Sequence, residues 1–176
     1  MTARRYAVLL RGINVGGNNK LPMAELRPML EGRGYERVAT YIQSGNVVLD
    51  APVEGDAALA ADITAAIAER FGLDIAVVVR THAELVQIVD DNPFADHLDE
   101  KNKLMVGFAM QPLPAEQVTA RPGSVDQFVI RRREVFLYCP DGIGRSKLPD
   151  FDRQTKVAVT VRNWNTVLKL VSMTEP

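Results

Sequence analysis

A run of glycines, asparagines and one lysine follows an apolar stretch in LLRGINVGGNNKLPM, residues 9–23. Paired glycines let backbone N–H groups converge on an anion, and the N-terminus of a following helix adds a positive dipole. The spacing matches neither a dinucleotide-binding fingerprint nor a Walker loop, and a plain strand-to-helix turn is the alternative. The candidate ligand-binding residues of this loop are Arg11, Asn14, Gly16, Gly17 and Lys20.

A second polar cluster lies in YIQSGN, where Gln43, Ser44 and Asn46 are candidate ligand-binding residues. Alternation along a strand would place Tyr41 and Gln43 on one face, opposite Ile42. Ser-Gly is typical turn chemistry, so a well-formed hairpin is the competing interpretation.

A third cluster occupies YCPDGIGRSKLP, residues 138–149, and contributes Arg145, Ser146 and Lys147 as candidates. Arginine suits bidentate recognition of phosphate or carboxylate, and lysine adds a point charge. The segment is long and has few apolar anchors, which is typical of functional loops. A solvated basic loop is the alternative.

The last cluster is TVRNWNTVLKL, which we expect to begin the C-terminal helix. Arg162 and Asn163 would lie in its first turn and complete the set of candidates. Trp164 could stack on a base or sugar, but its spacing with Leu168 and Val171 favours a place in the core.

No catalytic constellation stands out in the rest of the chain. His82 and His97 have no carboxylate or cysteine at a metal-ligand spacing, so we expect no metal and no cofactor. His82 is expected at the surface, and Cys139 is expected to be buried and inert. Glu100 and its acidic neighbours suggest solvated charges at helix ends.

Composition indicates a soluble globular protein, with 47% hydrophobic and 24% charged residues among 176. No apolar run is long enough to span a bilayer, no secretory signal is recognisable, and the single cysteine favours a reducing cytoplasm. Lys/Arg outnumber Asp/Glu by seven to four in residues 1–50 and nine to five in residues 131–176, while residues 51–130 have five against thirteen. The two basic ends could form one positive face.

Hydrophobic spacing predicts an α+β fold. Residues 1–80 fit the order β-α-β-β-α-β, with Pro22 suiting a helix start, Pro28 kinking or shortening that helix, and Asp56 suiting the cap of the next. The strands are expected at residues 5–11, 38–43, 46–50 and 75–80.

Residues 81–176 fit the same plan less completely, as β-α-β-β-α after a helix with a Thr81–Glu84 capping box. The strands are expected at residues 104–110, 128–131 and 135–139, with a short helix at 114–120. We therefore predict two closely packed ferredoxin-like (βαββαβ-type) subdomains, residues 1–80 and residues 81–176, the second ending in the C-terminal helix.

The motifs LLRGINVGGNNKLPMAEL, YIQSGNVVL, NPF, YCPDGIGRSKLP and TVRNWNTVLKL resemble the DUF1697 family of uncharacterised, mainly bacterial proteins. The resemblance covers nearly the whole chain and implies a pair of ferredoxin-like subdomains, but no reaction. Pro28 and TKVAVTVRN depart from the family pattern. The matching positions are Arg11, Gly12, Asn14, Gly16, Gly17, Lys20, Gln43, Ser44, Gly45, Asn46, Arg145, Ser146, Lys147, Arg162, Asn163, Trp164 and Asn165.

The leading functional hypothesis is a cytoplasmic protein that binds a phosphorylated ligand, either a nucleotide or a nucleic acid, at a basic Asn/Gly-rich site between the subdomains. Arginine and lysine would supply charge, and the amides would supply directional hydrogen bonds. An enzyme acting on a small phosphorylated or carboxylated metabolite is one alternative. A protein-interaction module without a small ligand is the other.

Overall fold

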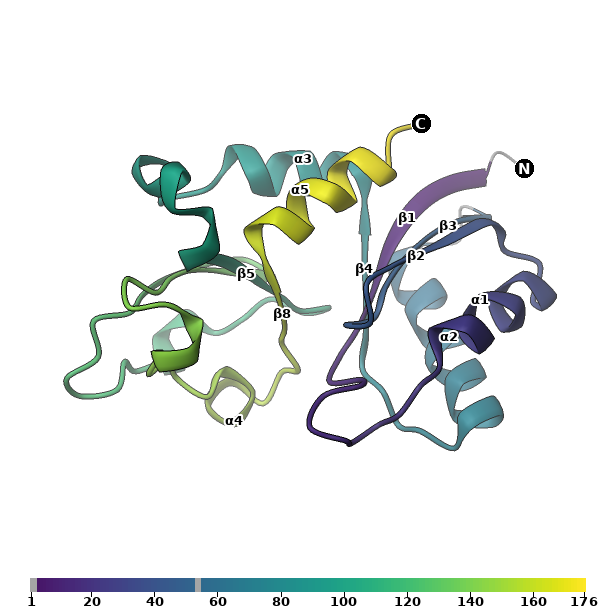
Figure 1. Cartoon of the computed structure of the whole chain (residues 1–176), viewed down its shortest axis with the longest axis horizontal. Helices are drawn as coiled ribbons and strands as arrows, with labels where there is room; N and C mark the ends of the chain where they lie inside the picture. Colours follow the sequence, from purple (N-terminus) through teal and green to yellow (C-terminus); the bar gives the residue numbers. More distant parts are fainter. Residues whose placement is uncertain (1–2, 53–54) are drawn as a thin grey trace. The chain divides into compact units, whose positions relative to one another are not determined.

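The protein has a mixed α+β fold, seen in a computed structural model that describes residues 3–52 and 55–176 (Figure 1). Two compact units are present: unit 1 comprises Met1–Leu85 with Leu170–Pro176, and unit 2 comprises Val86–Lys169. The described residues form two four-stranded antiparallel sheets. The division at residue 80 that the sequence predicts stays a prediction.

Unit 1 contains a sheet with strand order β2-β3-β1-β4. Each neighbouring pair is antiparallel, so β3 lies between β1 and β2, and β1 lies between β3 and β4. This confirms the predicted β-α-β-β-α-β order. The elements are β1 (Ala3–Leu10), α1 (Met23–Gly32), β2 (Glu36–Tyr41), β3 (Asn46–Pro52), α2 (Asp56–Phe71), β4 (Val77–Thr81) and the start of α3 (His82–Asp90).

The apolar faces of α1 and α2 explain how unit 1 folds. Leu26 and Leu30 of α1 and Ile63 and Ile67 of α2 are fully buried, at the spacing that places them on one side of each helix. The two helices lie side by side against one face of the sheet (Figure 1). Pro28 is accommodated within the ten-residue α1, and Gly55, not Asp56, occupies the N-cap of α2.

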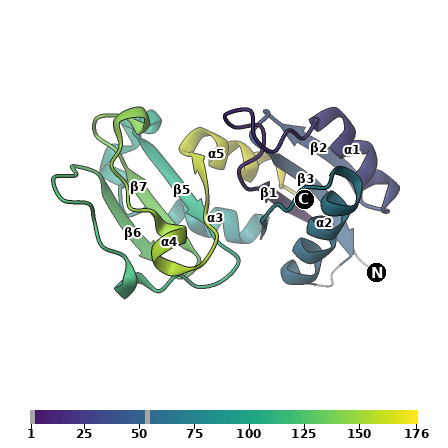
Figure 2. The same ribbon diagram turned by 90° about the horizontal axis from the view of Figure 1, so that it is seen from below.

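Unit 2 has the strand order β6-β7-β5-β8, which repeats the order of unit 1 with each strand number raised by four. Figure 2 shows β6, β7 and β5 side by side. The elements are the 3₁₀ segments η1 (Ala95–Lys103), η2 (Ala115–Gln117) and η3 (Ile143–Arg145), with β5 (Leu104–Phe108), β6 (Gln127–Arg131), β7 (Glu134–Tyr138), α4 (Phe151–Thr155), β8 (Thr160–Asn163) and the first part of α5 (Trp164–Met173), whose last residues belong to unit 1.

A close approach of backbone to side chains marks the middle of the unit 2 sheet. A Cβ added at Gly107 of β5 would lie 2.5 Å from Val135 Cγ1 and 2.8 Å from Val159 Cγ1. Real Cβ atoms are not found at such separations, so only glycine fits here. The strand therefore packs tightly against the valines of the surrounding core.

The structure corrects two predictions in unit 2. Residues 160–163 form the strand β8, with Thr160 and Arg162 buried and Val161 and Asn163 exposed, where we expected the first turn of a helix. The alternation of buried and exposed residues, together with the β-branched Thr160 and Val161, favours this extended conformation. The short helix expected at residues 114–120 is only a 3₁₀ turn, Ala115–Gln117.

The predicted capping box is confirmed where β4 meets α3. Glu84 Oε2 accepts from the backbone N–H of Thr81 at 2.8 Å, and the backbone N–H of Glu84 donates to Thr81 Oγ1 at 3.3 Å. In α5, Trp164 is buried as expected. The buried face of α5 continues through Val167 and Leu170. Leu168 and Val171, which the sequence predicted to share this face with Trp164, are only half-buried.

Candidate functional site

Residues 12–20 form a small hairpin of their own between β1 and α1. Val15 and Asn18 bridge each other, with Asn18 N donating to Val15 O at 3.0 Å. Gly16 and Gly17 between them have φ of 57° and 79°. Positive φ at both central residues defines a type I′ turn, which favours glycine. The glycine pair thus makes the turn, and its role in phosphate binding stays a prediction.

Asn14 fixes this small hairpin against the rest of unit 1. Its Oδ1 accepts from Leu21 N at 2.9 Å, and its Nδ2 donates to Leu21 O at 2.9 Å and to Gln43 O at 3.1 Å. The first two polar clusters predicted from the sequence are therefore brought together. Since these bonds use both amide hydrogens, the Asn14 side chain holds the loops in place.

Asn46 organises the turn between β2 and β3 from the inside. It is fully buried, and its Nδ2 donates to Tyr41 O and to Ser44 Oγ, each at 3.0 Å. A buried amide with these partners shapes the turn from beneath, and Ser44 is half-buried beside it.

Gly45 allows the same turn to approach the end of β1. Its carbonyl oxygen accepts from Leu10 N at 2.8 Å. A Cβ at this position would lie 2.8 Å from Ile13 Cδ1 and 2.9 Å from Leu10 Cβ, and the glycine has φ of 83°. Both the space and the left-handed backbone require glycine here.

The two loops present Arg11, Lys20 and Gln43 as exposed polar side chains. Val15 and Ile42 beside them are 62% and 51% exposed. Ile42 has φ of 50°, an unusual conformation for a β-branched residue, and such strain concentrates at functional sites. The predicted alternation through residues 41–43 is wrong, because β2 ends at Tyr41 and Ile42 turns the chain.

In unit 2 the third cluster forms a turn held by backbone hydrogen bonds. Ser146 N donates to Ile143 O at 3.1 Å, and Lys147 N donates to Asp126 Oδ2. The side chains of Arg145 and Lys147 are exposed, whereas Ser146 is half-buried. Two cations are therefore displayed on a turn with a fixed backbone.

Arg162 lies in a different environment from the one predicted. It is 7% exposed on β8, and its Nη1 donates to Thr160 Oγ1 at 2.8 Å and to Val161 O at 2.9 Å. Burial lowers the pKa of its guanidinium to about 10. Asn163 Oδ1 accepts from Thr166 N at 2.8 Å, so this side chain caps α5. Both side chains have structural partners.

The candidates thus fall into two groups, each within one unit. Unit 1 holds those at residues 11–20 and 43–46, joined through the Asn14–Gln43 hydrogen bond. Unit 2 holds those at residues 145–147 on a loop, together with Arg162 and Asn163 on β8. That the two groups form one shared ligand site stays a prediction.

A cluster of titratable side chains in unit 2 was missed. Glu100 accepts from Tyr138 OH at 2.8 Å and bonds to Lys103, and His97 stacks on Tyr138 with ring centroids 3.9 Å apart. The hydrogen bonds from Lys103 and then Tyr138 lower the pKa of Glu100 to about 2. The 3₁₀ geometry is interrupted at His97 and Glu100, so the spacing of these residues gives no regular sequence signal for the cluster.

Two expectations for single residues have different outcomes. Cys139 is fully buried, which confirms the expected burial, and burial together with Asp126 raises the pKa of its thiol to about 12. His82 is half-buried, not a free surface residue, because its Nδ1 lies 3.2 Å from Val171 O and 3.1 Å from Thr174 Oγ1.

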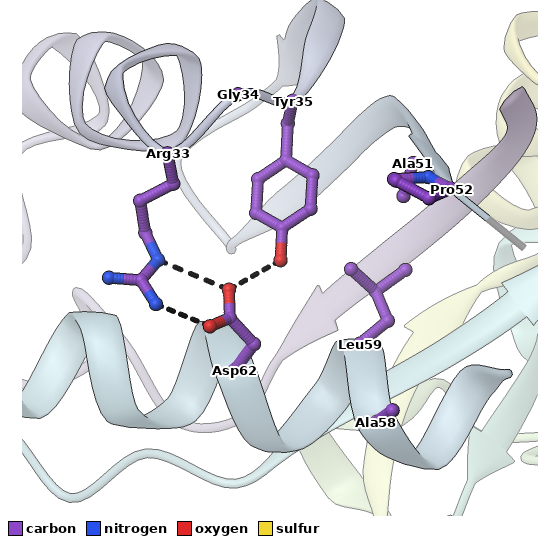
Figure 3. A pocket seen from close by; sticks show the side chains of 8 residues that line it. All are labelled: Arg33, Gly34, Tyr35, Ala51, Pro52, Ala58, Leu59 and Asp62. Atoms are coloured by element: carbon purple, nitrogen blue, oxygen red, sulfur yellow. Dashed lines mark hydrogen bonds and ion pairs between the residues drawn. The ribbon is translucent and has the colours of Figure 1, made fainter. Parts of the chain in front are cut away.

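A pocket of about 270 Å³ in unit 1 is shown in Figure 3. Asp62 of α2 bonds there to Arg33 and to Tyr35 OH, which follow α1. The hydrogen bond from Arg33 lowers the pKa of Asp62 more strongly than burial raises it, and Tyr35 lowers it further. The polar groups bond to one another, so this cluster ties the end of α1 to α2.

Neither a metal-binding cluster nor a membrane-spanning helix is found among the described residues. No group of three or more His, Cys, Asp or Glu side chains is placed to hold a metal ion. Across residues 3–52 and 55–176, no helix has the length and apolar character needed to cross a membrane.

The fold defines an α+β protein with two four-stranded antiparallel sheets. The chain belongs to the family described as Protein of unknown function (DUF1697), whose model matches residues 3–136. It is similar in fold to the conserved bacterial protein SP0830 from Streptococcus pneumoniae, with 24% identity and a TM-score of 0.77 over 99% of this chain and 100% of that one. No curated protein matches this chain.

Proposed function

We propose that the protein binds a phosphorylated ligand, a nucleotide or a nucleic acid, through the exposed cations of its polar loops. In unit 1 these are Arg11 and Lys20, with Gln43 as a hydrogen-bonding partner. Arg145 and Lys147 serve the same purpose in unit 2. The observation that carries the proposal is the Asn14 linkage, which holds loop 12–20 against turn 42–45 while the charged side chains face solvent. A cytoplasmic location is part of this proposal.

The chemistry of the unit 1 loops matches the two parts of a nucleotide. Arg11 and Lys20 suit phosphate, whose negative charge attracts guanidinium and ammonium groups. Val15 and Ile42 offer exposed apolar surface next to these polar groups for a base or sugar. Because the loops are already fixed by buried or half-buried amides, little conformational entropy is lost on binding.

The N-terminus of α1 adds a weaker attraction for an anion. Its N-cap is Pro22, which supplies no side-chain hydrogen bond to the first turn. The positive end of the helix dipole therefore has no side-chain cap. Glu25 in that turn opposes an anion, but it forms an ion pair with Arg70 at 3.2 Å.

We also propose that each unit is ferredoxin-like. The support is the strand order, in which β3 separates β1 from β2 and β1 separates β3 from β4, with a helix after β1 and another after β3. Unit 2 has the equivalent strand order, with only a 3₁₀ turn after β5 and the five-residue α4 after β7.

A thermal-shift screen tests the proposed function. The panel contains nucleotides, phosphosugars, simple anions and short RNA and DNA oligomers at two salt concentrations, because a ligand that binds only the folded state raises Tm. The variants are Lys20→Ala and Arg145→Ala, with Lys101→Ala as a control at another exposed lysine.

A salt-sensitive rise in Tm with oligomers, reduced in Lys20→Ala or Arg145→Ala but not in Lys101→Ala, supports nucleic-acid binding. A rise confined to nucleotides with the same variant pattern supports a small phosphorylated ligand. The proposal fails if no phosphorylated compound raises Tm, or if all three variants respond as the unmodified protein does.

A further inference from the structure

A second pocket in unit 1, lined by three arginines, lies at the opposite end of β1 from loop 12–20. Its volume is about 580 Å³, within the range of small-molecule sites. Arg5 at the pocket and Arg11 at the loop are six residues apart along the extended chain, which corresponds to about 20 Å. Its polar lining consists of Arg4 and Arg5 of β1, Arg37 of β2, Thr81, His82 and Thr174.

One carboxylate serves two of the three arginines. Arg5 Nη1 lies 2.8 Å from Asp50 Oδ1, and Arg37 Nε bonds to Asp50 Oδ2. The Asp50 side chain is 8% exposed. Burial raises its pKa, but the hydrogen bonds from Arg37 and Arg5 outweigh this and keep it ionised. Arg5, Arg37 and Asp50 together therefore carry a net positive charge.

Donor groups remain for a ligand after these contacts are made. Arg5 Nε donates to Met173 O at 2.7 Å and its Nη1 to Asp50, which holds the guanidinium in a fixed orientation. Within residues 3–52 and 55–176, no acceptor bonds to Arg5 Nη2. Arg4 is exposed and has no ion pair among the same residues. A guanidinium fork held in this way suits an oxyanion.

The His82 ring is also held in one orientation at the pocket. Thr174 Oγ1 donates its hydrogen to Leu170 O at 2.7 Å, so it can accept from His82 Nδ1 at 3.1 Å, and Val171 O also faces Nδ1. Nδ1 therefore carries a hydrogen, which leaves Nε2 as the remaining polar atom of the ring. A ligand hydroxyl can donate to it.

We propose that this pocket binds a small phosphate ester. The phosphate is held by the free arm of Arg5, with the exposed Arg4 and Arg37 at the pocket adding positive charge. The volume exceeds that of an inorganic phosphate and accommodates an organic part beside Ala3, Ala83 and Pro176. The site is independent of the loops proposed above, because it shares no residue with them.

Isothermal titration of the full chain with phenyl phosphate tests the proposal, with benzyl alcohol as the uncharged comparison. The central variant is Arg4→Gln, because an exposed side chain without an ion pair can be replaced without unfolding the strand. Arg5→Gln is the second variant. The control is Arg27→Gln, another exposed arginine, and Lys20→Ala reports whether the ligand binds at the proposed loop site instead.

We expect phenyl phosphate to bind and benzyl alcohol not to bind. Arg5→Gln should raise Kd about tenfold, as loss of a charged hydrogen bond does, and Arg4→Gln should raise it about threefold through loss of a nearby positive charge, while Arg27→Gln keeps the original Kd. The inference is overturned if phenyl phosphate does not bind, if Arg4→Gln leaves Kd unchanged, or if Lys20→Ala weakens binding as much. The last result would assign the ligand to the loop site.

Discussion

The side-chain amide of Asn14 donates to the backbone oxygen of Gln43 at 3.1 Å, across 29 residues of sequence. This single bond joins two motifs that look like independent turns in the sequence. The same amide also binds both backbone groups of Leu21, so it sets the path from β1 to α1. The cations of the loop are therefore displayed on a fixed scaffold.

Replacing Asn14 with alanine should lower the free energy of unfolding by about 1–3 kcal/mol, because half-buried backbone groups lose their partners. Urea denaturation measures this loss. Asn18→Ala is the matched control, since Asn18 is exposed and bonds through its backbone. Equal stability of the two variants would contradict the structural role of Asn14.

Gly45→Ala should destabilise the protein by about 2 kcal/mol or more, since it combines a left-handed backbone with a steric clash. The clash is with Ile13 and Leu10, whose atoms would lie within 2.8–2.9 Å of the new Cβ. Gly17 has a similar φ of 79°, but a Cβ added there would have no atom within 4 Å. Gly17→Ala should therefore lower the free energy of unfolding by only about 1 kcal/mol. Similar losses in both variants, measured by thermal unfolding, would show that the clash relaxes.

Gly107→Ala should destabilise unit 2 by about 1–3 kcal/mol through overpacking against Val135 and Val159. Val135→Ala removes one of the two clashing side chains. In a double-mutant cycle the combined loss should be smaller than the sum of the single losses, because the new methyl group fills the space left by Val135. Strict additivity would mean that the two sites do not touch.

The lowered pKa of Glu100 predicts how the free energy of unfolding changes at acid pH. Its folded pKa is lowered to about 2 from 4.5, so its ionised form stabilises the folded state. This stabilisation is fully present above the unfolded pKa and is lost as pH falls through about 2. The stability difference between the protein and Glu100→Gln should therefore be constant near neutral pH and shrink between about pH 5 and pH 2. A difference independent of pH would contradict the ionised hydrogen-bonded state.

Much of the fold could be predicted because hydrophobic spacing reports burial directly. The α1 and α2 stripes, the β2–β3 and β6–β7 hairpins and the Thr81–Glu84 capping box all follow from local patterns. β8 was missed because TVRN is too short to show alternation clearly and runs directly into α5. Its strand character depends on pairing with β5, a contact distant in sequence.

The candidate site was predictable by residue type but not by role. Asn14 and Asn46 were recognised as polar groups in loops, yet their amides turn inward and bond to the backbone. The left-handed conformation of Ile42 has no sequence signal, because β-branched residues rarely adopt it. The Arg4–Arg5–Arg37 pocket depends on β1 and β2 lying on either side of β3, which no local pattern reveals.

The most direct measurement is an NMR titration that follows backbone amide shifts as ADP or a short single-stranded RNA is added. The proposed function predicts that the amides of Gly16, Gly17, Lys20 and Gln43 shift together and saturate, and that Lys20→Ala weakens the response. If neither probe moves the amides of residues 12–20 and 42–45, the polar loops do not form a site for a phosphorylated ligand.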